Sequence, residues 1–145
     1  MSLSGGASRA ALSLGSNVGA RDELLARARA ALAADPAVQL AAESAPRDTA
    51  PQGFTAQPDF LNQVLLVRTD LSPWELLRAC LRVEEELGRV RGPLKWGPRN
   101  IDVDILGYGG LVLSERGLRI PHAALGLRPF FLEMLREIGA EDVLP

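Results

Sequence analysis

The stretch Trp96-Gly97-Pro98-Arg99-Asn100-Ile101-Asp102-Val103-Asp104-Ile105 ends in a pattern that is typical of a half-buried strand. Successive side chains of a strand point to opposite faces. The three apolar residues of its second half therefore share one face, which suits a core. The two carboxylates share the other face, roughly 6.5–7 Å apart along the backbone. Two carboxylates held this close on a rigid element indicate a seat for a hard divalent cation.

The acid pair alone has a simpler interpretation, which its spacing favours: a strand whose polar face carries two solvated acids. Two observations weigh against it. Asp is depleted in strands, and the loop before the pair is basic, with Arg89, Arg91, Lys95 and Arg99. A helix C-terminus accounts for Arg89 and Arg91, because cations are favourable there, but it does not account for the other two. Carboxylates that could hold a metal ion, next to basic side chains that could bind phosphate, indicate metal-assisted phosphoryl chemistry.

Composition places few limits on function. The 145 residues, 47% hydrophobic and 23% charged, fit one soluble domain with a single core. We expect residues 1–8 to be a disordered leader and residues 9–145 to form that domain. The net charge of −2 gives no indication of a nucleic acid or an anionic membrane as partner. The basic residues are almost all Arg, which suits phosphate binding but fits genome composition better.

The start of the chain has neither the charged nor the apolar region of a signal peptide. No apolar run approaches the ~20 residues that span a bilayer, so we expect a cytoplasmic protein without membrane contact. Cys80 is the single cysteine, which excludes an intrachain disulfide, and we expect it to be buried and inert.

The periodicities predict an α+β domain of ferredoxin-like βαββαβ order, an antiparallel sheet with helices on one face. The expected strands are residues 9–14, 38–44, 60–68 and 101–108, and the expected helices are residues 21–34, 73–87 and 130–138. Ser72, Pro73 and Glu75 form a strong helix start. Residues 111–113 are a candidate short return strand. Residues 47–59 and 88–100 are predicted as long loops, either binding loops or plain surface connections.

Other residue groups are weak signals when taken singly. Phe60 and Asn62 share a strand face and could read a flat heterocycle, although a core Phe and a satisfied Asn are commoner. Trp96 is either a surface aromatic or a stacking plate. His122 is the only histidine, and a lone His is more often structural, but it has Arg116, Arg119 and Arg128 near it in sequence. Residues 15–17 could form a nucleotide turn, but they do not match a Walker A sequence.

Taken in order, these motifs resemble one family, the 6-hydroxymethyl-7,8-dihydropterin pyrophosphokinases of folate biosynthesis. The resemblance runs from about residue 11 to residue 144. Its motifs are LGSN at 14–17, QPDFLN at 57–62, GRVR at 88–91, WGPRNIDVDI at 96–105, PH at 121–122, and Arg128-x-Phe130. Two positions depart from the family pattern: Ala123 stands where Tyr often follows the Pro-His pair, and Leu81 stands where Gln is common.

The resemblance implies a transferase that moves pyrophosphate from ATP to the hydroxymethyl oxygen of the pterin and releases AMP. It implies two Mg²⁺ ions at Asp102 and Asp104, and a monomer with small-molecule substrates. Catalysis would rest on those two acids with Arg89 and Arg99. ATP would be bound by Glu84, Arg91, Trp96, Arg99, Ile105, Arg116, His122 and Arg128. The pterin would be bound by Thr49, Phe60, Asn62, Trp96 and Phe130.

Two other functions remain open from the residues alone. A ferredoxin-like module that binds RNA is one, but the acidic pI near 5.4 and the few aromatics argue against it. Another Mg²⁺-dependent nucleotide enzyme is the second, for example a kinase that forms ADP or a nucleotidyltransferase. The reaction product distinguishes these possibilities.

Overall fold

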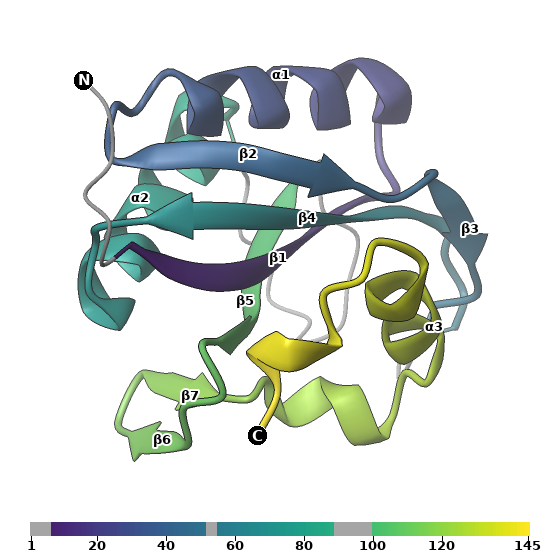
Figure 1. The fold of residues 1–145 in the computed structure, drawn as a ribbon. Helices are drawn as coiled ribbons and strands as arrows, with labels where there is room; N and C mark the ends of the chain where they lie inside the picture. Colours follow the sequence, from purple (N-terminus) through teal and green to yellow (C-terminus); the bar gives the residue numbers. More distant parts are fainter. Residues whose placement is uncertain (1–6, 52–54, 89–99) are drawn as a thin grey trace.

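The fold is seen in a computed structural model that describes residues 7–51, 55–88 and 100–145 (Figure 1). Its elements in chain order are β1 (Ser8–Ser16), α1 (Arg21–Ala33), β2 (Val38–Glu43), β3 (Arg47–Thr49), β4 (Phe60–Thr69), α2 (Pro73–Glu86), β5 (Asp102–Tyr108), β6 (Leu113–Glu115), β7 (Leu118–Ile120), the 3₁₀ turn η1 (Ala123–Gly126), α3 (Phe130–Glu137) and the 3₁₀ turn η2 (Glu141–Val143).

The main sheet has the order β2-β4-β1-β5, and the short β3 also pairs with β4. All of these pairs are antiparallel. The first and last strands of the βαββαβ core are therefore neighbours, with β1 central and β5 at one edge. This arrangement confirms the predicted α+β class and ferredoxin-like order.

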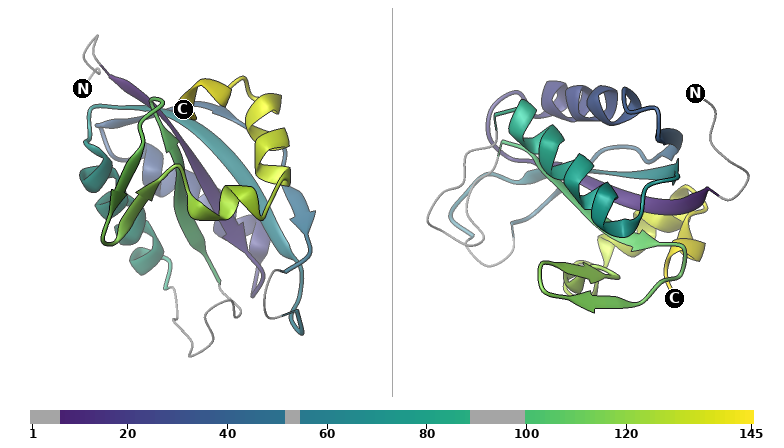
Figure 2. Two further views of the ribbon diagram at one scale, coloured as in Figure 1. Left: turned by 90° about the horizontal axis from the view of Figure 1, so that it is seen from below. Right: turned by 90° about the vertical axis from the view of Figure 1, so that its left-hand side faces the viewer.

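The two faces of the sheet are covered by different helices (Figure 2). Helices α1 and α2 pack on one face, in a core that includes Leu12 and Leu14 of β1 and Val103 and Ile105 of β5. Helix α3, which follows the βαββαβ unit, packs on the opposite face against the alternate residues of the same strands, among them Ala11. Since side chains alternate along a strand, each strand contributes to both layers.

Helix α2 begins as its sequence predicts. The Ser72 hydroxyl accepts a hydrogen bond from the Glu75 amide, and the Glu75 carboxylate accepts one from the Ser72 amide. Pro73 occupies the first turn, where its missing N–H costs nothing. At the other end, Gly88 has φ of +75°, which ends the helix at a conformation that glycine tolerates.

Three local predictions differ from the structure. The predicted loop at 47–59 begins with a strand, β3, because residues 47–49 pair with the end of β4. The predicted return strand at 111–113 is wrong: the strand starts at Leu113 and pairs with β7 instead of following β5 back. Gly109 and Gly110, both with positive φ, turn the chain away from the sheet there. Strand β1 also begins at Ser8, inside the expected leader.

Replacing Gly107 with Ala is expected to destabilise the fold by about 1–3 kcal/mol. A Cβ atom at this position would lie 2.8 Å from the backbone oxygen of Val143 and 2.9 Å from its Cγ2, so η2 would have to move off β5. Gly126→Ala is the matched control, because a Cβ there meets nothing within 4 Å. Urea unfolding of both variants measures the difference, and equal midpoints would contradict the prediction.

Candidate active site

The acid pair lies on β5 as the alternation predicts. Val103 and Ile105 are buried in the core beneath α1 and α2. Asp102 and Asp104 are half-buried and belong to the opposite face of the strand, which is the face that α3 covers further along the sheet. The two carboxylates are therefore next to each other on one rigid strand, within reach of solvent.

A row of three residues crosses the sheet beside this pair. In the register of the strands, Gly15 of β1 is paired with Asn62 of β4 on one side and with Asp102 of β5 on the other. In the next row, Ser13 lies between Val64 and Asp104. The central strand thus presents only a hydrogen and a small hydroxyl side chain between the carboxamide of Asn62 and the carboxylates. The surface of the sheet between the two groups is therefore covered only by small side chains.

The residues predicted to read the pterin gather on β3 and β4. Asn62 is 5% exposed, and its Nδ2 donates a hydrogen bond to the Thr49 hydroxyl. Phe60 lies two residues before Asn62, on the same face of β4, and is half-buried. Phe130 begins α3, which packs against this face, and its ring lies 4.5 Å from that of Phe131. The structure therefore places these four predicted residues on one side of the sheet.

The end of the LGSN motif contacts the segment that leads into β4. Asn17 is 3% exposed, and its Nδ2 donates to Oε1 of Gln57 at 2.8 Å and to the carbonyl oxygen of Pro58 at 3.0 Å. These bonds tie the end of β1 to the segment that leads into Phe60. The LGSN and QPDFLN motifs both belong to the family resemblance, but only the fold shows that they are in contact.

His122 is brought to the acid pair. Its backbone amide donates to the Leu106 carbonyl at 3.0 Å, which places it beside β5. Its Nδ1 accepts a hydrogen bond from the Ala124 amide at 3.0 Å, and its Nε2 lies 3.8 Å from Oδ1 of Asp104. An acceptor at Nδ1 leaves the proton of a neutral imidazole on Nε2, facing the carboxylate. Arg128 is half-buried and lies just before α3, the helix that packs on this face of the sheet.

Two residues predicted to bind ATP have their side chains elsewhere. Ile105 is 3% exposed in the core beneath α1 and α2, because it alternates with Asp104. Glu84 is equally buried, and its Oε2 accepts a hydrogen bond from the Val103 amide at 2.8 Å. Neither side chain therefore faces the side of β5 that carries the acids.

Arg116 is not brought to the acid pair either. It occupies the turn between β6 and β7, where a Cβ on the adjacent Gly117 would lie 3.6 Å from Trp74 of the first turn of α2. The acids lie near the opposite end of α2, because Glu84 in its last turn is hydrogen-bonded to Val103, between the two acids. Arg119 is exposed, while its neighbours in β7 are buried in the core beneath the helices, so its side chain points away from that core. Arg89, Arg91, Trp96 and Arg99 lie outside the described residues.

The donor set fits a magnesium ion that is shared with phosphate. Within residues 7–51, 55–88 and 100–145, no group of three or more His, Cys, Asp or Glu side chains is arranged to hold a metal ion. Asp102 and Asp104 are thus two oxygen donors of hard character without a full protein cage. Mg²⁺ is typically held by one or two carboxylates together with waters and substrate phosphates, so the residues present fit that ion.

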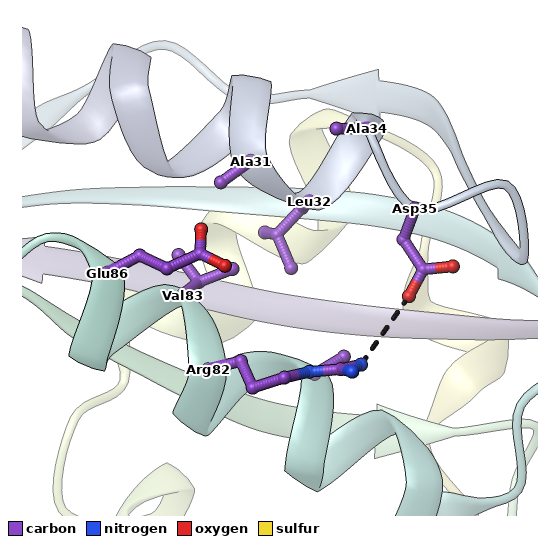
Figure 3. Close-up of a pocket in the computed structure, with 8 residues that line it drawn as sticks. Ala31, Leu32, Ala34, Asp35, Arg82, Val83 and Glu86 are labelled. Atoms are coloured by element: carbon purple, nitrogen blue, oxygen red, sulfur yellow. Dashed lines mark ion pairs between the residues drawn. The ribbon is translucent and has the colours of Figure 1, made fainter.

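A separate pocket lies between α1 and α2 (Figure 3). These helices cover the face of the sheet opposite to the acids. It encloses about 280 Å³ and is lined partly by Leu32 and Val83. Asp35 and Arg82 form an ion pair at 3.8 Å across it.

Within residues 7–51, 55–88 and 100–145, no helix has the length and apolar character needed to cross a membrane.

Cys80 is fully buried in α2, as predicted, and we expect it to be unreactive in the folded protein. Burial raises the pKa of its thiol, and the charges of Asp104 and Glu84 raise that pKa further. Because the thiolate is the reactive form, Ellman's reagent at pH 8 should modify the native chain only as fast as the chain opens. The denatured chain should react at once. Rapid stoichiometric reaction under native conditions would contradict this.

The fold and the site define a class of protein: a ferredoxin-like α+β domain with a pair of carboxylates on an edge strand and a buried carboxamide two strands away. Comparison with known proteins then gives the family. The model of the 7,8-dihydro-6-hydroxymethylpterin-pyrophosphokinase family matches residues 11–140. The chain belongs to this family.

Similar proteins carry the corresponding names. A 2-amino-4-hydroxy-6-hydroxymethyldihydropteridine pyrophosphokinase of Methylorubrum extorquens is 44% identical over 94% of this chain and 85% of its own length. Its namesake in Bacillus subtilis is 39% identical over 88% of this chain and 75% of its own length. The folic acid synthesis protein fol1 of Schizosaccharomyces pombe is 39% identical over 92% of this chain, which spans 18% of that longer protein.

Proposed function

We propose that this protein transfers pyrophosphate from ATP to the hydroxymethyl group of 6-hydroxymethyl-7,8-dihydropterin, giving AMP and the pterin diphosphate, in folate biosynthesis. The observation that carries the proposal is the row Asn62–Gly15–Asp102 across three adjacent strands. It puts the Asn62 carboxamide and the Asp102 carboxylate on one surface, and the residue between them on β1 is a glycine. A reaction that joins a flat heterocycle to a metal-bound triphosphate needs that juxtaposition.

In this proposal Asn62 and Thr49 read the polar edge of the pterin, and Phe60 and Phe130 pack against its faces. The hydrogen bond from Asn62 to Thr49 already fixes the carboxamide, which is 5% exposed. The hydroxymethyl oxygen then points over Gly15 toward β5. That oxygen forms a bond to the β-phosphorus of ATP, loses its proton, and the bond from the β-phosphorus to the AMP oxygen breaks.

Asp102 and Asp104 would hold two Mg²⁺ ions with the triphosphate. When bound, these ions neutralise charge on the phosphates and lower the pKa of the attacking hydroxyl. His122, Arg119 and Arg128 would contact the nucleotide from the strands and turns around β5. Arg89, Arg91, Trp96 and Arg99 would close over ATP, with Arg89 and Arg99 required for turnover, and exclude water from the reaction.

The test is product identity. The protein incubated with ATP, Mg²⁺ and the hydroxymethyl pterin should form AMP and the pterin diphosphate in equal amounts. ADP as product would indicate an ordinary kinase, and no pterin-dependent turnover would favour a binding module. Gel filtration tests the expectation that the working form is a monomer.

A further inference from the structure

The C-terminal end of α2 is attached to the start of β5 at two points. Glu84, in the last turn, accepts a hydrogen bond from the Val103 amide at 2.8 Å. Asn100, just before the strand, donates from Nδ2 to the carbonyl oxygens of Leu87 and Gly88 at 3.1 and 3.0 Å. The helix end is thereby fixed to both the entry and the second residue of the strand that carries the acids.

The Val103 amide needs a partner because β5 is at the edge of the sheet. Among the strands of the described residues, in the order β2-β4-β1-β5, only β1 lies beside it in the ladder. Edge strands present unpaired N–H groups on their outer side, and the acceptor for this one comes from a helix side chain. Val103 also separates Asp102 from Asp104, so this bond fixes the peptide unit that joins Asp102 to Val103, one residue before Asp104.

A carboxylate is a costly choice for this bond. Glu84 is 3% exposed, and burying a charge near two further carboxylates is unfavourable unless strong bonds compensate for it. Donation from a backbone amide to a carboxylate is such a bond. Its neighbour Glu85 is exposed, so the burial is specific to the one glutamate that meets β5.

We propose that Glu84 is a positioning residue: through the Val103 amide, it holds Asp102 and Asp104 at the spacing that their metal ion requires. The inference rests on the proposed function, and it replaces the predicted contact between Glu84 and ATP. Loss of outer-shell partners of this kind typically lowers metal affinity by about 10–100-fold.

The experiment compares Glu84→Leu, Glu84→Gln and the control Glu85→Gln. Calorimetry measures the affinity for a non-hydrolysable ATP analogue with Mg²⁺ and again with EDTA. The ratio of the two affinities isolates the metal-dependent part, which a general loss of stability does not change. We expect the ratio to fall about tenfold in Glu84→Leu, and to stay near the unaltered value in Glu84→Gln, which keeps an oxygen acceptor, and in Glu85→Gln.

Amide hydrogen exchange in the unaltered protein is a second measurement that needs no variant. The Val103 amide should be protected although it faces the sheet edge, and Glu84→Gln should keep that protection. The inference is overturned if Glu84→Leu keeps the full ratio, if Glu84→Gln loses as much as Glu84→Leu, or if the Val103 amide is unprotected. A ratio of one in the unaltered protein would overturn the proposed function as well.

Discussion

Replacing Asp102 or Asp104 with Ala is expected to reduce turnover at least about a thousandfold, which is roughly 4 kcal/mol of transition-state stabilisation. The two side chains are the oxygen donors on the exposed face of β5, and no third acidic, His or Cys side chain in the described ranges completes a metal site with them. Each acid therefore has no substitute. Binding of the pterin should survive, because Asn62 lies two strands away, on β4, and Thr49 lies on β3 beyond it.

AMP formation under single-turnover conditions measures the loss, and pterin fluorescence measures binding. Asp22→Asn is the control, since Asp22 is an exposed acid in the first turn of α1, on the other side of the sheet. A near-normal rate in both alanine variants would show that the pair does not hold the metal. Loss of pterin binding with loss of turnover would indicate that the strand itself had been disturbed.

The sequence was sufficient for features that depend on neighbouring residues. The alternation of apolar and acidic residues after Asn100 predicted which side of β5 is buried, because side-chain direction in a strand follows from parity alone. The start of α2 followed from Ser72, Pro73 and Glu75, whose hydrogen bonds form within one turn. The shared face of Phe60 and Asn62 followed from the same parity argument.

The features that the sequence did not predict depend on partners far along the chain. Strand β3 exists because Arg47 to Thr49 meet β4, and three residues carry no periodicity of their own. The bond of Glu84 spans 19 positions, from a helix to an edge strand. In sequence, that glutamate is one of three in a row. The helical period of Leu76, Cys80 and Val83 puts it on the buried face of α2, but does not indicate its contact with β5. Arg116 and Arg119 belong to one hairpin, the first in its turn and the second in β7, so only the fold distinguishes them.

Gly15 belongs to the LGSN motif, so the sequence drew attention to it. Only the strand register shows why a glycine is suited to this position. It has no unusual φ, so the backbone does not require glycine there. A Cβ atom at this position would lie 3.1 Å from Oδ1 of Asn62 and 3.8 Å from Cδ1 of Phe60. The missing side chain therefore leaves space above the sheet between Asn62 and Asp102, where the substrate would lie in the proposed reaction.

Gly15→Val is accordingly expected to weaken pterin binding about 100-fold, and Gly15→Ala about 10-fold, since crowding of a well-packed site costs roughly 1–3 kcal/mol. The added methyl groups would displace the Asn62 carboxamide and fill the space above residue 15. Binding of a non-hydrolysable ATP analogue with Mg²⁺ should change little, because Asp104 and His122 lie further along β5.

Titration calorimetry with the pterin and with the nucleotide analogue separates these effects, and thermal unfolding checks that the variants fold. Valine suits a strand, so a folded Gly15→Val protein is the expected material. The graded loss from Gly to Ala to Val identifies a steric cause, because a merely loosened strand would weaken nucleotide binding equally. If folded Gly15→Val bound the pterin as tightly as the unaltered protein, the substrate could not lie across β1, and the row Asn62–Gly15–Asp102 would no longer support the proposed reaction.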